Sequence, residues 1–285
     1  MTIIIDGTVA DITLENEKTL GDALLGIEKW VDESGFCLSR ISVDGADTEA
    51  RGMEALFARN IDDIKTLDIV TRPFAAFYGE ALFELIETLN LWNEEAGKRE
   101  LIEAEYKKSP SYSFLSKHDK ELLRLLCGGT LNGGFSGEDM EKTLATARAR
   151  SLEAENPVAA FLGLENKLNE ESAKLLDLPL DLQTGNDKRA ARTVEDFSNA
   201  TQNMLRLMPS LQYAMLKKAD VFADSILFDE FKSALKEFAE AYENKDMVLS
   251  GDLAEYELAP RVKEIYAALK KKLPMQEFNQ ELNYV

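Results

Sequence analysis

The single histidine is the residue with the widest chemical repertoire in this chain of 285 residues. His118 lies in the polar run Ser116–Lys120. A histidine that activates a serine or cysteine nucleophile needs partners at defined positions, and the sequence does not identify them. Zinc sites of the common compositions also need more than one histidine or a larger set of cysteines. We therefore interpret His118 as a solvated or capping side chain at the start of a helix.

The glycine-rich stretch Cys127–Gly134 is a second candidate, because the glycines of a phosphate-binding loop let backbone amides surround an anion. In such loops the glycines follow a strand and lead into a helix, often with a lysine. Here they follow a predicted helix, the lysine is missing, and the next helix opens with Glu138 and Asp139, which repel phosphate. We interpret the stretch as a flexible connector.

Pairs of carboxylates could supply the acid and base of glycoside hydrolysis or bind a hard cation. The chain has 52 acidic residues, so neighbouring acids are expected by chance. Such groups include Asp62-Asp63, Glu94-Glu95, Glu170-Glu171 and the set Asp252, Glu255 and Glu257. A carboxylate metal site in a helical bundle also uses Glu-x-x-His elements, and the sequence contains none. We therefore expect no catalytic residue, no metal ligand and no cofactor.

The composition indicates an acidic protein with hydrophobic cores. Hydrophobic residues make up 45% of the chain and charged residues 30%, and the formal net charge of −19 argues against a nucleic-acid partner. The chain opens without a secretion signal, and its apolar runs are shorter than the roughly 20 residues of a membrane span. Cys37 and Cys127 suit a reducing compartment with both thiols free. We expect a cytoplasmic protein without a membrane span.

The first seventy residues combine the periodicities of strands and of one helix. Gly7 separates two runs that predict a hairpin. Apolar residues at spacings of three and four then predict a helix that Thr19 caps. The predicted strands are Thr2–Asp6, Val9–Leu14, Cys37–Val43 and Ile64–Val70, and the predicted helix is Thr19–Glu33.

This pattern of two hairpin strands, one helix and two further strands resembles the β-grasp, or ubiquitin-like, superfamily. Members that are conjugated or carry sulfur end in an exposed Gly-Gly, whereas here the last strand continues into Thr71-Arg72-Pro73. Members that bind an iron–sulfur cluster use four cysteines, and this region has Cys37 alone. The resemblance therefore implies the use of the fold to bind partners.

From Pro73 onward helix periodicity replaces strand periodicity, which predicts an α+β protein with a β-grasp domain at 1–72 and an all-helical bundle at 73–285. Two segments, Leu178–Asp187 and Ser250–Asp252, are predicted connections because proline or glycine interrupts them. The predicted helices are Phe74–Glu95, Ser116–Leu126, Ser136–Ala154, Pro157–Leu176, Asp187–Met208, Phe222–Glu243 and Leu253–Lys272, with a restart or kink at Pro260. The two-part layout also resembles uncharacterised bacterial proteins.

We therefore expect a non-enzymatic adaptor or scaffold that binds proteins through the sheet and through helical grooves. One alternative is a carboxylate- or metal-dependent hydrolase with its site in a cleft between the domains. Another is a structural subunit that assembles with copies of itself through Leu253–Val285. The expected partner-binding residues, on the outer sheet and its rim, are Asp6, Asp11, Arg40, Asp44 and Asp68.

Overall fold

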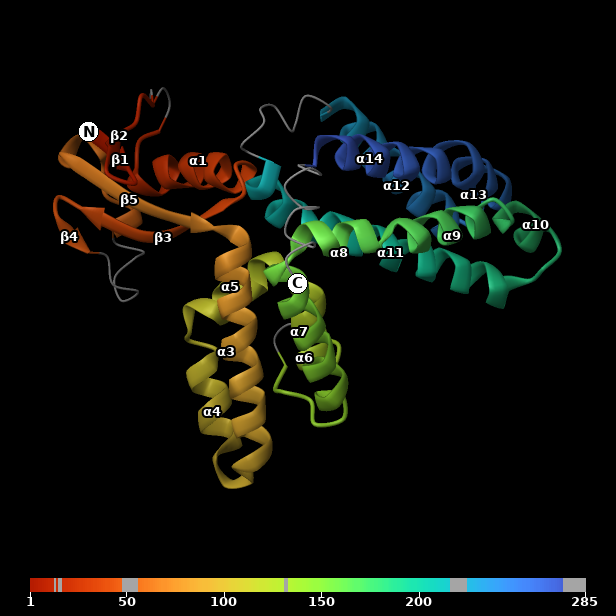
Figure 1. Cartoon of the computed structure of the whole chain (residues 1–285), viewed down its shortest axis with the longest axis horizontal. Helices are drawn as coiled ribbons and strands as arrows, with labels where there is room; N and C mark the ends of the chain where they lie inside the picture. Colours follow the sequence, from red (N-terminus) through yellow and green to blue (C-terminus); the bar gives the residue numbers. More distant parts are fainter. Residues whose placement is uncertain (13, 15–16, 48–55, 131–132, 216–224, 274–285) are drawn as a thin grey trace, which may run out of the picture. The chain divides into compact units, whose positions relative to one another are not determined.

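A computed structural model describes the chain except for residues 13, 15–16, 48–55, 131–132, 216–224 and 274–285. The chain divides into two compact units, Met1–Glu155 and Asn156–Val285 (Figure 1). The predicted domain boundary between residues 72 and 73 falls at the junction of a strand and a helix within the first unit, and it stays a prediction.

The first unit begins with a mixed sheet of five strands and one helix. The strand order is β2-β1-β5-β3-β4, with β1 and β5 parallel and the other neighbours antiparallel. This order confirms the predicted α+β class and agrees with a β-grasp sheet. The elements are β1 (Thr2–Ile5), β2 (Thr8–Val9), α1 (Leu20–Glu33), β3 (Phe36–Val43), β4 (Ala46–Asp47), the 3₁₀ turn η1 (Ile61–Asp63) and β5 (Thr66–Pro73).

Two Asp-Gly turns form the hairpins of this sheet. Asp6-Gly7 and Asp44-Gly45 all have positive φ, between 50° and 84°, which is the conformation that a two-residue hairpin of type I′ requires. The hairpin at Gly7 is confirmed, but the predicted strand Val9–Leu14 is wrong beyond Val9. The following apolar residues Ala10, Ile12 and Leu14 pack against the hydrophobic core and do not extend the ladder. Strand β4 was not predicted.

Helix α1 forms as its sequence predicts. The Thr19 side chain accepts a hydrogen bond from the Asp22 amide, and the Asp22 carboxylate accepts one from the Thr19 amide, which completes a capping box. All five residues of the predicted apolar face are buried: Leu20, Ala23, Leu24, Ile27 and Val31. All of them except Ala23 share a hydrophobic cluster with the sheet residues Ile3, Leu67 and Ile69, so this face of the sheet is covered.

The rest of the first unit is helical. Its elements are α3 (Phe74–Glu94), η2 (Ala96–Lys98), α4 (Arg99–Tyr106), α5 (Pro110–His118), α6 (Lys120–Leu126) and α7 (Met140–Glu155). The predicted single helix Ser116–Leu126 is wrong, because the chain breaks at Asp119. There the carboxylate of Asp119 accepts a hydrogen bond from the Leu122 amide and so caps α6.

The second unit is helical throughout the part that the structure describes. Its elements are α8 (Pro157–Gly163), α9 (Glu165–Leu175), α10 (Leu178–Gln183), α11 (Asp187–Met215), α12 (Ser225–Glu243), α13 (Met247–Asp252), the π-helical segment η4 (Leu253–Leu258) and α14 (Ala259–Lys272). Pro260 lies in the first turn of α14, where proline is well tolerated.

The prediction of connections is wrong for Leu178–Gln183, which forms α10, and for Ser250–Asp252, which lies within α13. Pro179 lies in the first turn of α10, where its missing amide breaks no helical hydrogen bond. Gly251 lies within α13, where a β-carbon would approach Pro179 Cβ to 3.0 Å. The proline and the glycine therefore serve the close contact between α10 and α13.

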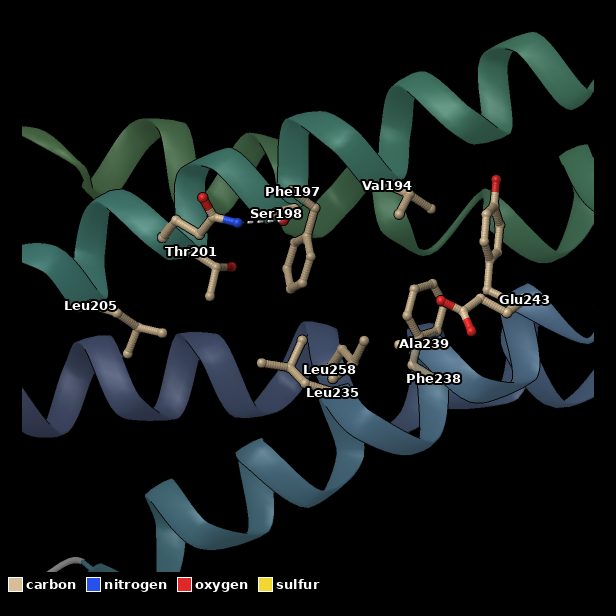
Figure 2. Close-up of a pocket in the computed structure, with 12 residues that line it drawn as sticks. Val194, Phe197, Ser198, Thr201, Leu205, Leu235, Phe238, Ala239, Glu243 and Leu258 are labelled. Atoms are coloured by element: carbon tan, nitrogen blue, oxygen red, sulfur yellow. Dashed lines mark hydrogen bonds between the residues drawn. The ribbon is translucent and has the colours of Figure 1, made fainter. Parts of the chain in front are cut away.

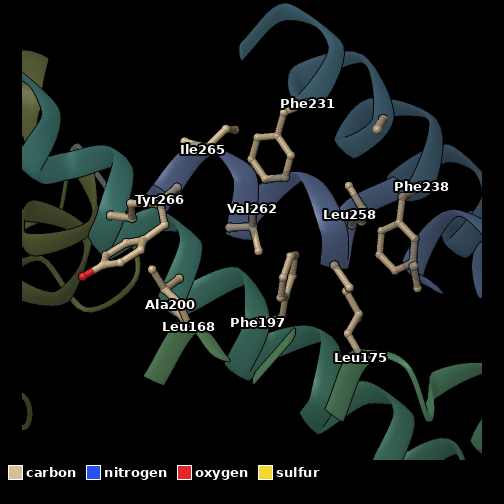
Figure 3. Close-up of a cluster of buried hydrophobic side chains, with 14 of the residues drawn as sticks. Leu168, Leu175, Phe197, Ala200, Phe231, Phe238, Leu258, Val262, Ile265 and Tyr266 are labelled. Atoms are coloured by element: carbon tan, nitrogen blue, oxygen red, sulfur yellow. The ribbon is translucent and has the colours of Figure 1, made fainter. Parts of the chain in front are cut away.

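Side chains from α9, α11, α12 and α14 form the core of the second unit. Figure 3 shows Phe197 of α11 and Phe231 of α12 directed toward Val262 of α14. Leu175 of α9 and Ile265 of α14 belong to the same cluster. No helix within the described ranges is long and apolar enough to cross a membrane.

Candidate functional site

Two of the predicted partner-binding residues, Asp6 and Asp44, hold turns of the sheet. The Asp6 carboxylate accepts hydrogen bonds from the Thr71 amide at 2.8 Å and the Thr71 hydroxyl at 2.6 Å. The Asp44 carboxylate accepts bonds from the Thr66 and Lys65 amides, which lower the pKa of this carboxyl, and it pairs with Arg59 at 3.1 Å. These contacts give both aspartates a structural role in the turns of the sheet.

The structure brings Arg40 and Asp68 onto one face of the sheet, opposite α1. Asp68 lies between Ile4 and Ser42 in the strand register, and Arg40 pairs with Val70. Asp11 is exposed beyond the end of β2, apart from that row. A role of all five residues in partner binding stays a prediction.

His118 is not the solvated side chain that its polar neighbours predicted. It ends α5 and is half-buried, with its ring centroid 5.1 Å from that of Phe74 and 4.6 Å from that of Phe114. Removal from water lowers the pKa of His118 to about 4. The ring is therefore neutral near pH 7 and acts as part of an aromatic cluster.

A buried polar network that the sequence did not reveal joins α3, α6 and α7. Asp119 pairs with Arg150, and both side chains are almost fully buried. The Tyr78 hydroxyl donates to Asp119 at 2.5 Å, and Arg150 also donates to Glu121 at 2.6 Å. The network fixes three elements together, and its two central charges satisfy each other.

The glycine-rich stretch has hydrogen bonds at both ends. Gly128 and Gly129 have positive φ, and the Gly129 amide donates to the Arg124 carbonyl, so these residues terminate α6. At the other end Lys107 donates to the Gly133 carbonyl at 2.8 Å. The stretch connects α6 with α7, as predicted, and these hydrogen bonds hold its described ends. Its flexibility stays a prediction. Residues 131–132 lie outside the described residues.

A groove lies between α11 and α12 in the second unit (Figure 2). Its volume is about 320 Å³, near the lower end of the roughly 300–1,000 Å³ typical of ligand pockets. Residues of α11 form one wall, residues of α12 form the other, and Leu258 of η4 closes the floor. The lining residues are Val194, Phe197, Ser198, Thr201, Gln202, Leu205, Leu235, Phe238, Ala239, Tyr242, Glu243 and Leu258.

Most of this lining is apolar. Phe197, Phe238 and Leu258 are buried, whereas Ala239 is exposed at the groove. The hydrophobic lining belongs partly to the core of the second unit, so the groove is a gap in the packing between two helices. Such a surface binds apolar groups from a ligand or from another protein.

The polar groups of the groove are few. Gln202 donates to the Ser198 hydroxyl at 3.1 Å, and Glu243 is the one carboxylate in the lining. Hydrolysis by paired acids needs two carboxylates at a defined separation, so this lining does not provide it. Over the described residues, no group of three or more His, Cys, Asp or Glu side chains could hold a metal ion.

Thr201 is the exception within the apolar wall. Its side chain extends from α11 toward the space between the helices in Figure 2, and the residue is 3% exposed. Its hydroxyl has no hydrogen-bond partner among the described residues. The sequence contained a signal for this site, because Thr201 interrupts the apolar series Val194, Phe197, Met204 and Met208 at helical spacing. Only the packing of α11 against α12 showed that a groove lies there.

The chain combines a mixed sheet and one helix at residues 1–73 with a mostly helical region, and two family models match parts of it. Residues 1–73 match the family of the TP0873 N-terminal domain, and residues 163–268 match a domain of unknown function, DUF8042. The second match includes every residue that lines the groove.

One relative extends over nearly the whole chain. The chain is 22% identical over 268 residues to an uncharacterized protein of Treponema pallidum (strain Nichols), covering 93% of this chain and 94% of the relative. This match, at 22% identity, supports the predicted resemblance to uncharacterised bacterial proteins. No solved structure matched the chain.

Proposed function

We propose that this protein is a non-enzymatic adaptor or scaffold, and that the groove between α11 and α12 receives apolar side chains from a partner protein. The observation that carries the proposal is an apolar groove between two long helices, with Glu243 as its one carboxylate. Grooves of this kind bind the apolar face of a partner helix through residues about one turn apart.

The exposed outer face of the sheet supports a second contact with partners. Arg40 and Asp68 lie on that face, and Arg40 is 4.0 Å from Asp47, with both side chains more than half exposed. An exposed pair at this distance contributes little to stability, which leaves both charges able to form contacts with another protein.

Affinity capture with a blocked groove tests the proposal. The full chain and its Ala239→Trp variant are used to capture proteins from a cell extract, followed by quantitative mass spectrometry. Ala239 is exposed at the groove, so an indole ring there should occupy the space without disturbing the buried core. We expect a partner whose recovery falls by roughly tenfold or more, as for the loss of a central interface contact.

Ser233→Trp is the matched control. Ser233 is exposed on the same helix α12 but does not line the groove. This variant adds the same ring and should leave recovery unchanged. Equal recovery by the full chain and by both variants would show that the groove does not bind the partner.

A further inference from the structure

We propose that the groove is built for an aromatic side chain that carries one hydrogen-bond donor, tyrosine or tryptophan, and that this donor pairs with the Thr201 hydroxyl. The proposal rests on the proposed function, because it names the chemistry of the partner residue that enters the groove. The partner segment is further expected to carry basic rather than acidic residues next to this aromatic residue.

The Thr201 hydroxyl is buried without a hydrogen-bond partner among the described residues. Its neighbours in the wall of the groove are mostly apolar. A buried threonine in a helix commonly donates to the carbonyl four residues earlier, but the structure contains no such bond from Thr201 to Phe197. An unpaired buried hydroxyl is unfavourable, so a ligand atom that pairs with it gains affinity.

The size of the groove and its aromatic walls fit a large aromatic side chain. A volume of about 320 Å³ accepts one large side chain. Phe197, Phe238 and Tyr242 line the groove, and aromatic rings pack favourably against one another in tilted or offset arrangements. Tyrosine and tryptophan combine a large apolar ring with one polar atom, and they are enriched among the residues that dominate interfaces.

The charge of the groove lining and of the whole chain is negative. The lining contains Glu243 and neither lysine nor arginine, and the whole chain has a net charge of −19. A carboxylate on the partner would be repelled at the rim and would find no cation in the groove. This composition selects a neutral aromatic donor over an anionic group, and it favours basic flanking residues.

Small analogues of the side chains test the proposal on the full chain. p-Cresol represents tyrosine, 3-methylindole represents tryptophan, and toluene represents phenylalanine, which lacks the donor. Binding is followed by NMR chemical-shift titration. We expect p-cresol and 3-methylindole to bind up to roughly tenfold more tightly than toluene, since one hydrogen bond separates them.

Variants of Thr201 separate the hydrogen bond from the shape of the groove. Thr201→Val has nearly the same shape without the hydroxyl, and should reduce p-cresol and 3-methylindole to the affinity of toluene. Thr201→Ser retains the hydroxyl and should retain the preference. Ser233→Ala removes a hydroxyl from an exposed position of α12 outside the groove, and should also retain the preference.

The outcomes distinguish this inference from the proposed function. Equal binding of toluene and p-cresol, a preference that survives Thr201→Val, or no binding of any probe would overturn the inference. A partner that is lost with Ala239→Trp would still support the proposed function in each of these cases. If the probes show the expected preference but no partner depends on the groove, the adaptor proposal fails instead.

Discussion

Asp119 lies at the end of α5 and at the start of α6, and its side chain pairs with Arg150 of α7. Its carboxylate caps α6, accepts from Tyr78 of α3 and pairs with Arg150 of α7. Burial of two charges is favourable only when each keeps its partner, because an isolated buried charge is strongly destabilising. The residue therefore links α3, α6 and α7 through polar contacts.

Removal of Arg150 is expected to destabilise the first unit. Arg150→Ala leaves Asp119 buried without its counter-charge and should lower the free energy of unfolding by about 3–5 kcal/mol. Arg148→Ala, at an exposed position of the same helix, should change it by less than about 0.5 kcal/mol. Urea denaturation measures both, and equal effects would show that the buried pair is not the cause.

His118 should make stability depend on pH. Burial lowers its pKa from 6.5 to about 4, so between these values the unfolded chain binds a proton that the folded chain does not. The contribution of His118 to the free energy of unfolding is therefore constant above pH 6.5. It lowers that free energy as the pH falls from 6.5 toward 4.

His118→Gln removes this titration and leaves the other titrating groups in place. We expect the parent protein to lose more stability than the variant when urea unfolding is measured at pH 7 and at pH 5. Lys117, Glu28 and Asp32 are the charged groups that influence the ring, and they are present in both proteins. Identical losses would contradict a lowered pKa.

Among the helices, two glycines differ in the space available for a β-carbon. Gly26 of α1 has open space where a β-carbon would lie, whereas Gly251 of α13 lies against Pro179 of α10. Glycine destabilises a helix relative to alanine. No contact with a described residue requires glycine at position 26, whereas the contact with Pro179 requires it at position 251.

Alanine substitutions should therefore change stability in opposite directions. Gly26→Ala is expected to raise the free energy of unfolding by about 0.5–1 kcal/mol through helix propensity. Gly251→Ala gains the same propensity but forces α10 and α13 apart, so it should lower stability by about 1–3 kcal/mol. Thermal or chemical unfolding measures both, and stabilisation by Gly251→Ala would show that this contact is not tight.

At the scale of the whole molecule, the chain consists of two compact units with separate hydrophobic clusters. The sheet and its helix have one cluster, the helices α3–α7 have another, and the second unit has the third. A loss of packing in one cluster should therefore act first on the elements that it holds together.

Phe231→Ala tests this division. Phe231 is 1% exposed in the core of the second unit, and its truncation should cost about 3–5 kcal/mol. Hydrogen exchange should accelerate in α11, α12 and α14 while α1 and α3 keep the rates of the parent protein. Phe83→Ala, at a side chain that is 64% exposed, is the control. Equal acceleration in both units would indicate one cooperative structure.

The sequence predicted the elements that depend on local patterns. Thr19, Asp22 and the apolar residues of α1 lie within a few positions of each other, so capping and helical spacing were enough to predict that helix. The turn at Gly7 and the start of α3 after Pro73 are local in the same sense. The α+β class follows from these elements together.

The tertiary structure decided what depends on residues far apart in the chain. The partners Asp119 and Arg150 are 31 positions apart, and the walls of the groove come from separate helices. The polar neighbours of His118 indicated solvent, but Phe74, more than forty positions earlier, removes the ring from water. Burial and pairing are properties of the packed chain, so the sequence alone determined the elements with local signals, such as α1, whereas packing determined the groove and the environment of each charge.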